Sequence, residues 1–164
     1  MKCQSCGSPL SLQSASRIPR CSYCDSHNLL PTDGVSIDGV VFLGNLTNRE
    51  CPACGDQLVA AALDNQPVEA CPNCFGVAVR DVIFADLVDG RRSSYRGPVS
   101  PPIPLDTREL ETERDCPDCR EPMHVHPYYG PGTTVIDSCP ACQLIWLDPG
   151  ELSAIEVAPG RRWA

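Results

Sequence analysis

Aromatic side chains are scarce in this sequence, while residues that interrupt regular structure are common. Aromatic residues make up only 5% of the 164 residues, whereas proline occurs 17 times. A chain of this length with so few large side chains does not fill one continuous hydrophobic core. We therefore expect three small units of roughly 30 to 40 residues, which need crosslinks to be stable.

Long apolar runs and an excess of basic residues are also lacking. The longest uninterrupted apolar run, Leu58 to Leu63, is far too short to cross a bilayer, so no membrane span is expected. The start, Met1 to Cys6, lacks the apolar stretch of an export signal, which predicts a cytoplasmic location. With 13 basic residues against 21 acidic ones and a formal net charge of -8, the chain has no global basic face for a nucleic-acid duplex.

Cysteine, in contrast, is abundant and strictly paired. Twelve cysteines form six Cys-x-x-Cys pairs, separated by 14, 26, 16, 41 and 19 residues. Because loop closure favours near partners, pairs across the short gaps are expected to share a metal ion, and the long gaps are linkers. Two intervening residues let both sulfurs of a pair face one tetrahedral zinc ion. The predicted ligands of three zinc ions are Cys3, Cys6, Cys21 and Cys24, then Cys51, Cys54, Cys71 and Cys74, then Cys116, Cys119, Cys139 and Cys142.

The residues beside the cysteines favour tight turns. Gly7 and Gly55 follow the second cysteine of their pairs, where such a turn often needs a positive φ that glycine adopts without penalty. Proline fixes φ directly after the first cysteine in four of the six pairs, as Pro52, Pro72, Pro117 and Pro140.

Other uses of paired cysteines are a disulfide framework, a redox site and an iron site. Disulfides require an oxidising compartment. A redox Cys-x-x-Cys normally stands alone at the end of a strand in a βαβ pattern, which is absent here. Iron stays open as an alternative, because the spacing alone does not choose between metals that four thiolates bind.

Catalytic chemistry has little support in the sequence. A closed four-cysteine site leaves no position for a reactive water, and no phosphate loop, nucleophile elbow or pair of catalytic carboxylates is found. His27 has no place as a ligand, because the four-sulfur sets are already complete. His124 and His126 alternate along a strand and could bind a surface metal, but no carboxylate lies beside them in sequence, so they are interpreted as solvent-facing residues. We expect a protein that is not an enzyme.

Strands are predicted between the cysteine pairs. Residues 58–63 and 68–70 flank the turn residues 64–67, and residues 123–129 and 133–137 flank Gly130-Pro131-Gly132. The order of knuckle, hairpin, knuckle and strand is that of a zinc ribbon. The predicted fold is therefore small, metal-stabilised and mainly β, with three zinc ribbons in tandem and a short helix after the third.

The linkers divide the chain into six parts. Residues 35–37 and 40–43 around Asp38-Gly39 have the pattern of a β-hairpin, and residues 90–115 are rich in proline and then in charge. The predicted organisation is ribbon 1 (1–31), a linker or β-hairpin (32–50), ribbon 2 (51–89), a proline-rich and charged linker (90–115), ribbon 3 (116–158) and a tail (159–164).

A strand running into a helix is predicted after the last cysteine pair. Asp148 is expected to cap the helix, with Pro149 in its first turn and Glu151 completing a capping box, and the helix should end near Val157. Ribbon 2 contains a degraded copy of this segment. Phe84 and Leu87 align with Leu152 and Ile155, and Ala78 stands where ribbon 3 has Trp146, which is expected to pack over its zinc site.

These motifs carry a family resemblance. Cys139-Pro140-x-Cys142 followed by Trp146-Leu147-Asp148-x-Gly150-Glu151-Leu152 resembles the bacterial zinc-ribbon family named for transcription factor IIB, over residues 116–157 and more loosely 51–88. The resemblance implies four-cysteine metal sites in both segments. The family usually has glycine two residues after the last ligand, which Gly76 matches and Leu144 does not. Residues 1–30 resemble only a generic zinc ribbon.

The expected partner is another protein. Three loaded four-cysteine sites would take the net charge to about -14, which favours an adaptor or regulatory module, associated with transcription, over a DNA-binding protein. The alternative is a nucleic-acid-binding regulator that uses residues 1–30, with Lys2, Arg17 and Arg20, or the cluster Arg91, Arg92 and Arg96. A redox- or zinc-responsive switch is a third hypothesis, and it requires one labile site. The sequence does not indicate an oligomeric state.

Overall fold

The computed structural model describes residues 2–10, 19–28 and 36–160. Predictions that involve Arg17, Val35 or residues 161–164 of the tail lie outside these residues. The elements are β1 (Val41–Glu50), β2 (Gln57–Leu63), β3 (Gln66–Ala70), β4 (Val77–Arg80), α1 (Asp81–Ser94), the 3₁₀ turn η1 (Glu109–Glu111), β5 (His124–Pro127), β6 (Val135–Cys139), β7 (Leu144–Leu147) and α2 (Glu151–Val157). The fold is mainly β, as predicted, with a helix after the third ribbon.

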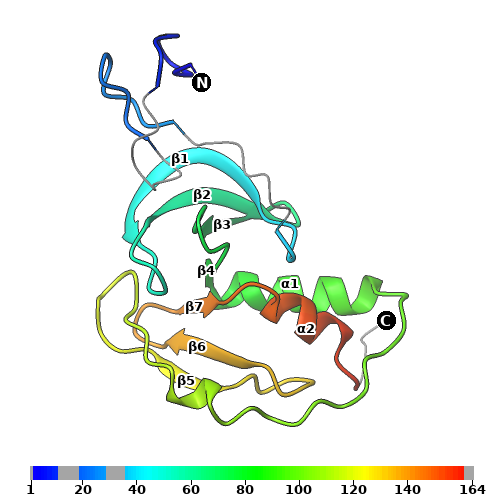
Figure 1. Ribbon diagram of the computed structural model, residues 1–164. Helices are drawn as coiled ribbons and strands as arrows, with labels where there is room; N and C mark the ends of the chain where they lie inside the picture. The colour runs from blue at the N-terminus through cyan, green and yellow to red at the C-terminus, as the bar shows by residue number, and fades with distance from the viewer. Residues whose placement is uncertain (1, 11–18, 29–35, 161–164) are drawn as a thin grey trace.

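Ribbons 2 and 3 join edge to edge in one antiparallel sheet (Figure 1). The seven strands follow the order β1-β2-β3-β4-β7-β6-β5. Both hairpins predicted between the cysteine pairs are confirmed, as β2–β3 and β5–β6. Asp64 and Asn65 form the two-residue turn of the first hairpin, and both have positive φ, as the right-handed twist of a hairpin requires.

The junction between the ribbons lies at an approximate twofold axis. The order β2-β3-β4-β7-β6-β5 is symmetric, because β2, β3 and β4 correspond to β5, β6 and β7. Ala78 of β4 pairs with Trp146 of β7, and these are the two residues that the sequence repeat aligns. Equivalent residues face each other in this way at the axis of a symmetric dimer. The two ribbons are therefore arranged like two halves of a dimer within one chain.

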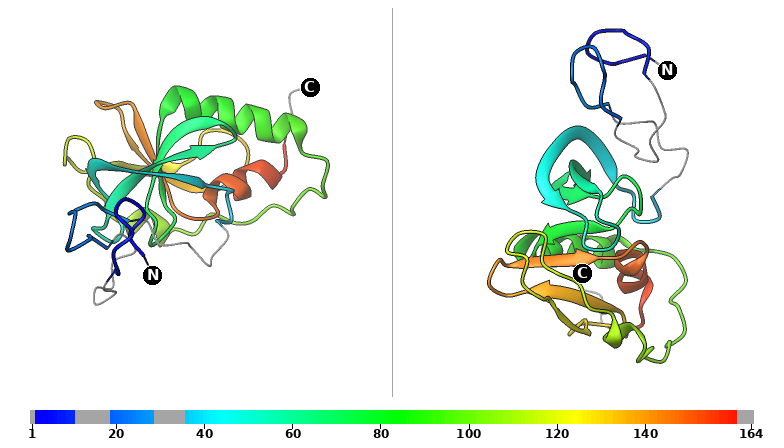
Figure 2. Two further views of the ribbon diagram at one scale, coloured as in Figure 1. Left: turned by 90° about the horizontal axis from the view of Figure 1, so that it is seen from above. Right: turned by 60° about the vertical axis from the view of Figure 1, so that its left-hand side comes forward.

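Two helices cover one face of the sheet, side by side (Figure 2). Their buried residues include the predicted equivalents Phe84 and Leu87 of α1 and Leu152 and Ile155 of α2. These side chains pack on sheet residues such as Val79 in one hydrophobic cluster. Because strands of both ribbons contribute to this cluster, ribbons 2 and 3 share a core. Within the described residues, neither helix is long and apolar enough to span a membrane.

The segment before ribbon 2 differs from the predicted hairpin. Ser36 to Gly39 form a turn, in which the Gly39 N–H donates to the Ser36 carbonyl, but the described residues 36–50 do not pair with one another as strands. The whole of β1 pairs with β2 instead, with two irregularities in register. The apolar pattern was therefore that of an edge strand added to ribbon 2.

The prediction that Asp148 caps α2 is wrong. Gly150 occupies the N-cap position with φ 92°, and the Asp148 carboxylate accepts from the indole N–H of Trp146 at 3.0 Å. Glu151 does accept from the Asp148 backbone N–H at 2.9 Å, but this bond is not part of a capping box, because Asp148 lies two residues before the N-cap. The missing cap comes from Asp38, whose carboxylate accepts from the backbone N–H groups of Gly150 at 2.7 Å and Ser153 at 2.9 Å.

Candidate metal centres

The structure brings the twelve cysteines together in three groups of four. The groups are those predicted from neighbouring pairs, and within each group all sulfurs lie within 4.8 Å of one another. All twelve are free cysteines, so none is engaged in a disulfide. In every pair the first cysteine is buried and the second is more exposed.

The sulfur separations fit zinc. Sulfurs from opposite knuckles lie 3.6 Å apart in Cys3–Cys24, 3.5 Å apart in Cys51–Cys74 and 3.7 Å apart in Cys119–Cys139. A tetrahedral ion with bonds of about 2.3 Å to sulfur requires separations of about 3.8 Å, whereas a disulfide bond is about 2.05 Å long. The three clusters therefore fit three zinc ions, each held by four sulfurs with no open position.

Five of the six knuckles share one pattern of backbone hydrogen bonds, whereas in the knuckle of Cys139 the Gln143 N–H donates to the Pro140 carbonyl at 3.4 Å. In the knuckle of Cys51, its N–H donates to the Asp56 carbonyl at 2.7 Å and its carbonyl accepts from the Gly55 N–H at 2.9 Å. The residue after the second cysteine has positive φ in all six knuckles, which confirms the expectation for the two glycines. Four knuckles adopt this conformation without glycine, at Asp25, Phe75, Arg120 and Gln143.

Hydrogen bonds and burial shift the pKa of the cluster sulfurs in both directions. The Ser26 hydroxyl lies 3.2 Å from the Cys3 sulfur and, with backbone donors, lowers the pKa of Cys3 to about 5. The backbone N–H of Glu121 similarly lowers the pKa of Cys119. Hydrogen bonds with Cys71 and Cys74 lower the pKa of Cys51 to about 2. The same hydrogen bonds with Cys51 raise the pKa of Cys71 and, to about 12, that of Cys74. Zinc requires thiolates, so its binding must release the protons that these two sulfurs retain.

Trp146 lies between the second and third metal centres. Its side chain is fully buried in a cluster that contains ligands of both sites together with Leu58 and Met123. This confirms the prediction that the indole is a core residue. The sequence did not indicate that the indole also serves the neighbouring site, because the contact crosses from one ribbon to the other.

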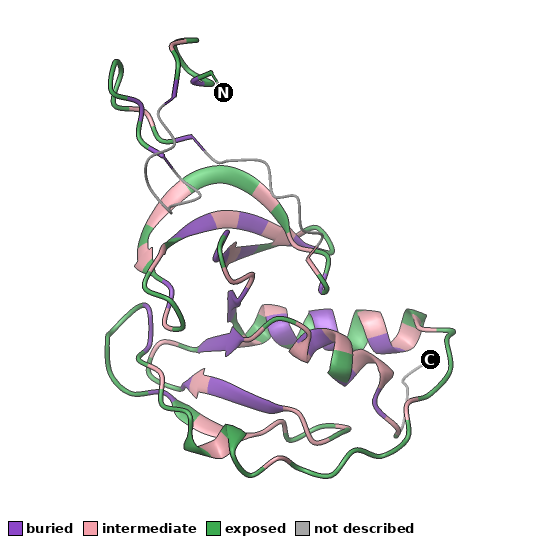
Figure 3. Cartoon of the chain, viewed as in Figure 1, coloured by how far each residue is buried: buried purple, intermediate pink, exposed green. Residues whose placement is uncertain are grey.

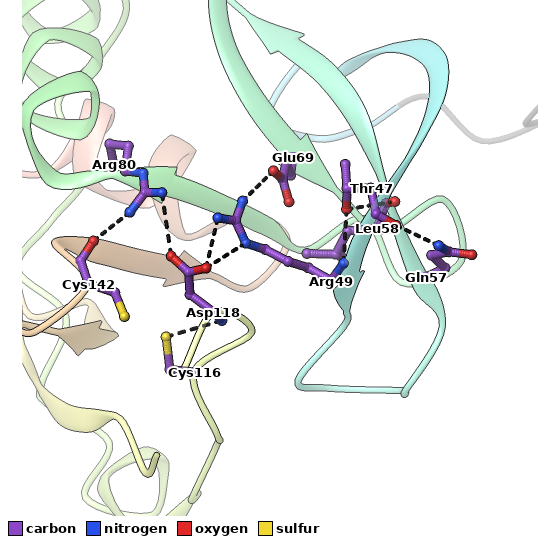
Figure 4. Close-up of polar contacts among 9 residues, drawn as sticks. All are labelled: Thr47, Arg49, Gln57, Leu58, Glu69, Arg80, Cys116, Asp118 and Cys142. Atoms are coloured by element: carbon purple, nitrogen blue, oxygen red, sulfur yellow. Dashed lines mark hydrogen bonds and ion pairs between the residues drawn. The ribbon is translucent and has the colours of Figure 1, made fainter. Parts of the chain in front are cut away.

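A polar network joins the third centre to ribbon 2 (Figure 4). Asp118, within the first knuckle of ribbon 3, accepts from Arg49 Nη2 at 2.9 Å and from Arg80 Nη2 at 3.4 Å. Arg80 Nη1 also donates to the carbonyl of Cys142 at 2.5 Å. Spacing along the chain carries no signal for these contacts, since Arg49 and Asp118 are 69 residues apart.

The predicted arginine cluster is partly used by the fold. Arg92 is only 2% exposed and donates to the carbonyls of Ile155 and Ala158 at the end of α2. Arg91 pairs with Asp64 and has 13% of its side chain exposed. Of the three arginines, only Arg96 is exposed. A phosphate backbone would therefore meet a single arginine here.

The histidines lie outside the sulfur clusters. His126 Nε2 lies 2.8 Å from the Ser138 hydroxyl, and its ring stacks on Tyr129. His124 is exposed on the same strand. His27 forms an isolated bridge with Arg20 in ribbon 1. No group of three or more metal-binding side chains in the described residues includes a histidine.

The comparison with known families supports the interpretation of ribbon 3 as a zinc ribbon. Residues 115–157 match a family model described as a transcription factor zinc-finger, the zinc ribbon of the TFIIB type. This confirms the resemblance predicted for residues 116–157, and the matched segment spans β5, β6, β7 and α2. No curated protein and no solved structure matches the chain.

Proposed function

We propose that this protein is a non-catalytic adaptor or regulatory module, associated with transcription, in which zinc stabilises the fold and the surface binds another protein. The four-sulfur centres support a structural role for the metal, because a closed site offers no coordination position to a substrate. We place the protein in the cytoplasm, where thiols remain reduced and available to zinc.

The open edge of β1 carries this proposal. β1 is the outermost strand of the sheet, and its second edge pairs with no strand in the described part of the chain. Val41 and Leu43 are each 60% exposed, and Figure 3 shows that exposed residues run along this strand. An exposed edge strand with apolar side chains offers backbone hydrogen bonds and side-chain contacts to an extended segment of a partner. We propose that the partner adds such a strand to β1.

Pull-down from native extracts with a tagged full-length chain, with and without nuclease, tests this function. Val41→Lys/Leu43→Lys places charge on the open edge and should abolish capture of the partner. Val82→Lys is the matched control, because Val82 is 68% exposed on α1, away from β1. Capture that survives the β1 substitutions, or that disappears with nuclease, would contradict the proposal.

Nucleic-acid binding by ribbon 1 is the second candidate. Tyr23 is 74% exposed between two zinc ligands, and Lys2 and Arg20 are exposed in the same small unit. Arg20 pairs with Asp25 only at the surface, which a phosphate can displace at little cost. Aromatic and basic side chains together suit single-stranded nucleic acid. Salt-sensitive binding that is lost in Tyr23→Ala would favour this candidate over the first.

A further inference from the structure

The metal centres of ribbons 2 and 3 share one cluster of buried side chains. The buried indole of Trp146 is packed in the same cluster as Cys51 and Cys71 of the second site and Cys116 and Cys139 of the third. Four further residues that are not ligands complete this cluster from both ribbons: Leu58, Ala78, Met123 and Leu144. Neither centre therefore has a hydrophobic surrounding of its own.

The ligand loops of the third site are also held by strands of ribbon 2. Asp118 stands between two zinc ligands, and its backbone N–H donates to the Cys116 sulfur at 3.4 Å. The Asp118 carboxylate is bound by Arg49 of β1 and Arg80 of β4, as Figure 4 shows. With the bond from Arg80 to the Cys142 carbonyl, both knuckles of the third site contact ribbon 2.

Ribbon 1 has its own, much smaller cluster. Its buried apolar residues in the described segments are Cys3, Leu10 and Cys21. Its β pairing there consists of two isolated bridges, Lys2–Pro9 and Arg20–His27. Figure 1 and the right-hand view of Figure 2 show the described segments of ribbon 1 standing apart from the sheet.

We propose that the second and third sites bind and release zinc as one cooperative unit, whereas the first site exchanges zinc independently and first. Zinc binding to such small units is coupled to their folding. Emptying the third site therefore removes the packing of Trp146 and the pairing of β7 from ribbon 2, so the second site loses affinity. By linkage, emptying the second site weakens the third equally.

The order of release follows from the surroundings of the sites. The first site has only three residues in its cluster and exposes Cys6 and Cys24 to solvent. The other two sites are each shielded by the shared cluster around Trp146. The protein should therefore pass from three bound zinc ions to two and then directly to none.

Native mass spectrometry of the full-length, zinc-loaded protein during titration with EDTA tests this sequence. We expect the two-zinc species to accumulate and the one-zinc species to remain minor at every EDTA concentration. Independent sites would instead give a prominent one-zinc species between the two-zinc and metal-free forms. That result, or a direct passage from three ions to none, would overturn the proposal.

Ligand substitutions provide a second, independent measurement. Cys139→Ser/Cys142→Ser removes the third site, and Cys71→Ser/Cys74→Ser removes the second. Each variant, purified with zinc, should retain one ion rather than two. The matched control Cys21→Ser/Cys24→Ser removes the first site by the same chemistry and should retain two. Two ions in either of the first two variants would contradict the coupling, and one or none in the control would contradict the independence of the first site.

Discussion

The Cα atom of Gly76 in ribbon 2 lies against the indole of Trp146 in ribbon 3. A methyl group at Gly76 would be 2.8 Å from Cη2 of the indole and closer still to Cζ2, so no larger residue fits. The repeat equivalent of Gly76 is Leu144, and that of Trp146 is Ala78. The two departures of this chain from a strict repeat therefore compensate each other, because small residues in one ribbon accept a large residue of the other.

Gly76→Ala should destabilise the protein by about 1 to 3 kcal/mol, because the added methyl overpacks a filled core. The measurement is urea unfolding in excess zinc. Gly76→Ala combined with Trp146→Leu should lose much less than the sum of the two single changes, since the smaller side chain relieves the overlap. Additive losses would show that the two residues do not interact.

Asp38→Ala should destabilise the protein by about 2 kcal/mol, because it removes the side chain that caps α2 from outside the helix. Asp38→Asn should lose less, since an acceptor oxygen remains. Thermal unfolding measures both changes. The control is Asp86→Ala, an exposed aspartate on α1 that should change stability little. Equal effects of Asp38→Ala and Asp86→Ala would argue against the cap.

Gln143→Gly should stabilise the protein by up to about 1 kcal/mol. Gln143 has φ 51°, a conformation that costs a residue with a side chain about 1 to 2 kcal/mol. Glycine avoids this cost, but its greater conformational entropy in the unfolded chain offsets part of the stabilisation. Gly55→Gln is the reverse change at an equivalent position with open space around it, and it should destabilise. Unfolding in excess zinc measures both, and the same sign for the two variants would refute the explanation.

Glu151 should make stability fall as the pH rises from about 4.5 to about 9. Burial raises the pKa of Glu151 to about 9, and the nearby carboxylates Asp148, Asp137 and Glu109 add to the rise, while the backbone N–H of Asp148 opposes it. Arg114, beside Asp148, is the basic group of this cluster. Because the folded state keeps a proton that the unfolded state has released, the free energy of unfolding decreases between pH 4.5 and about 9.

The test compares Glu151→Gln with wild type between about pH 6.5 and 8.5, by urea unfolding in excess zinc. Wild type should lose up to about 1.4 kcal/mol more per pH unit than the variant. Glu113→Gln, at an exposed position, should retain the dependence of the wild type. An identical pH dependence in Glu151→Gln and wild type would show that Glu151 is not the group responsible.

The metal centres and hairpins could be predicted from the sequence because their determinants are local. Two sulfurs separated by two residues reach one ion, and turns such as Asp64-Asn65 are encoded where they occur. The helix after ribbon 3 was predicted on the same basis. Its cap was not, because the acceptor is Asp38, which lies 112 residues away from Gly150.

The union of ribbons 2 and 3 could not be predicted for a different reason. β1 has the apolar pattern of a strand, but nothing in its sequence shows that it pairs with β2 rather than with residues 35–37, as in the predicted hairpin. The proline-rich residues 97–105 suggest a spacer between independent units, yet they connect two halves of one sheet. The packing of Gly76 against Trp146 depends on complementary side-chain sizes in two different ribbons. This complementarity can be recognised only when the positions of β4 and β7 are known.

The single indole at the pseudo-twofold axis also limits self-association. If ribbon 3 paired with ribbon 3 of a second molecule through the same edge, two indoles would compete for the space that one now fills. If ribbon 2 paired with another ribbon 2, Ala78 would face Ala78 and leave a void. Only the mixed pairing of a ribbon 2 with a ribbon 3 fills the space, so neither ribbon fits a second copy of itself through this edge.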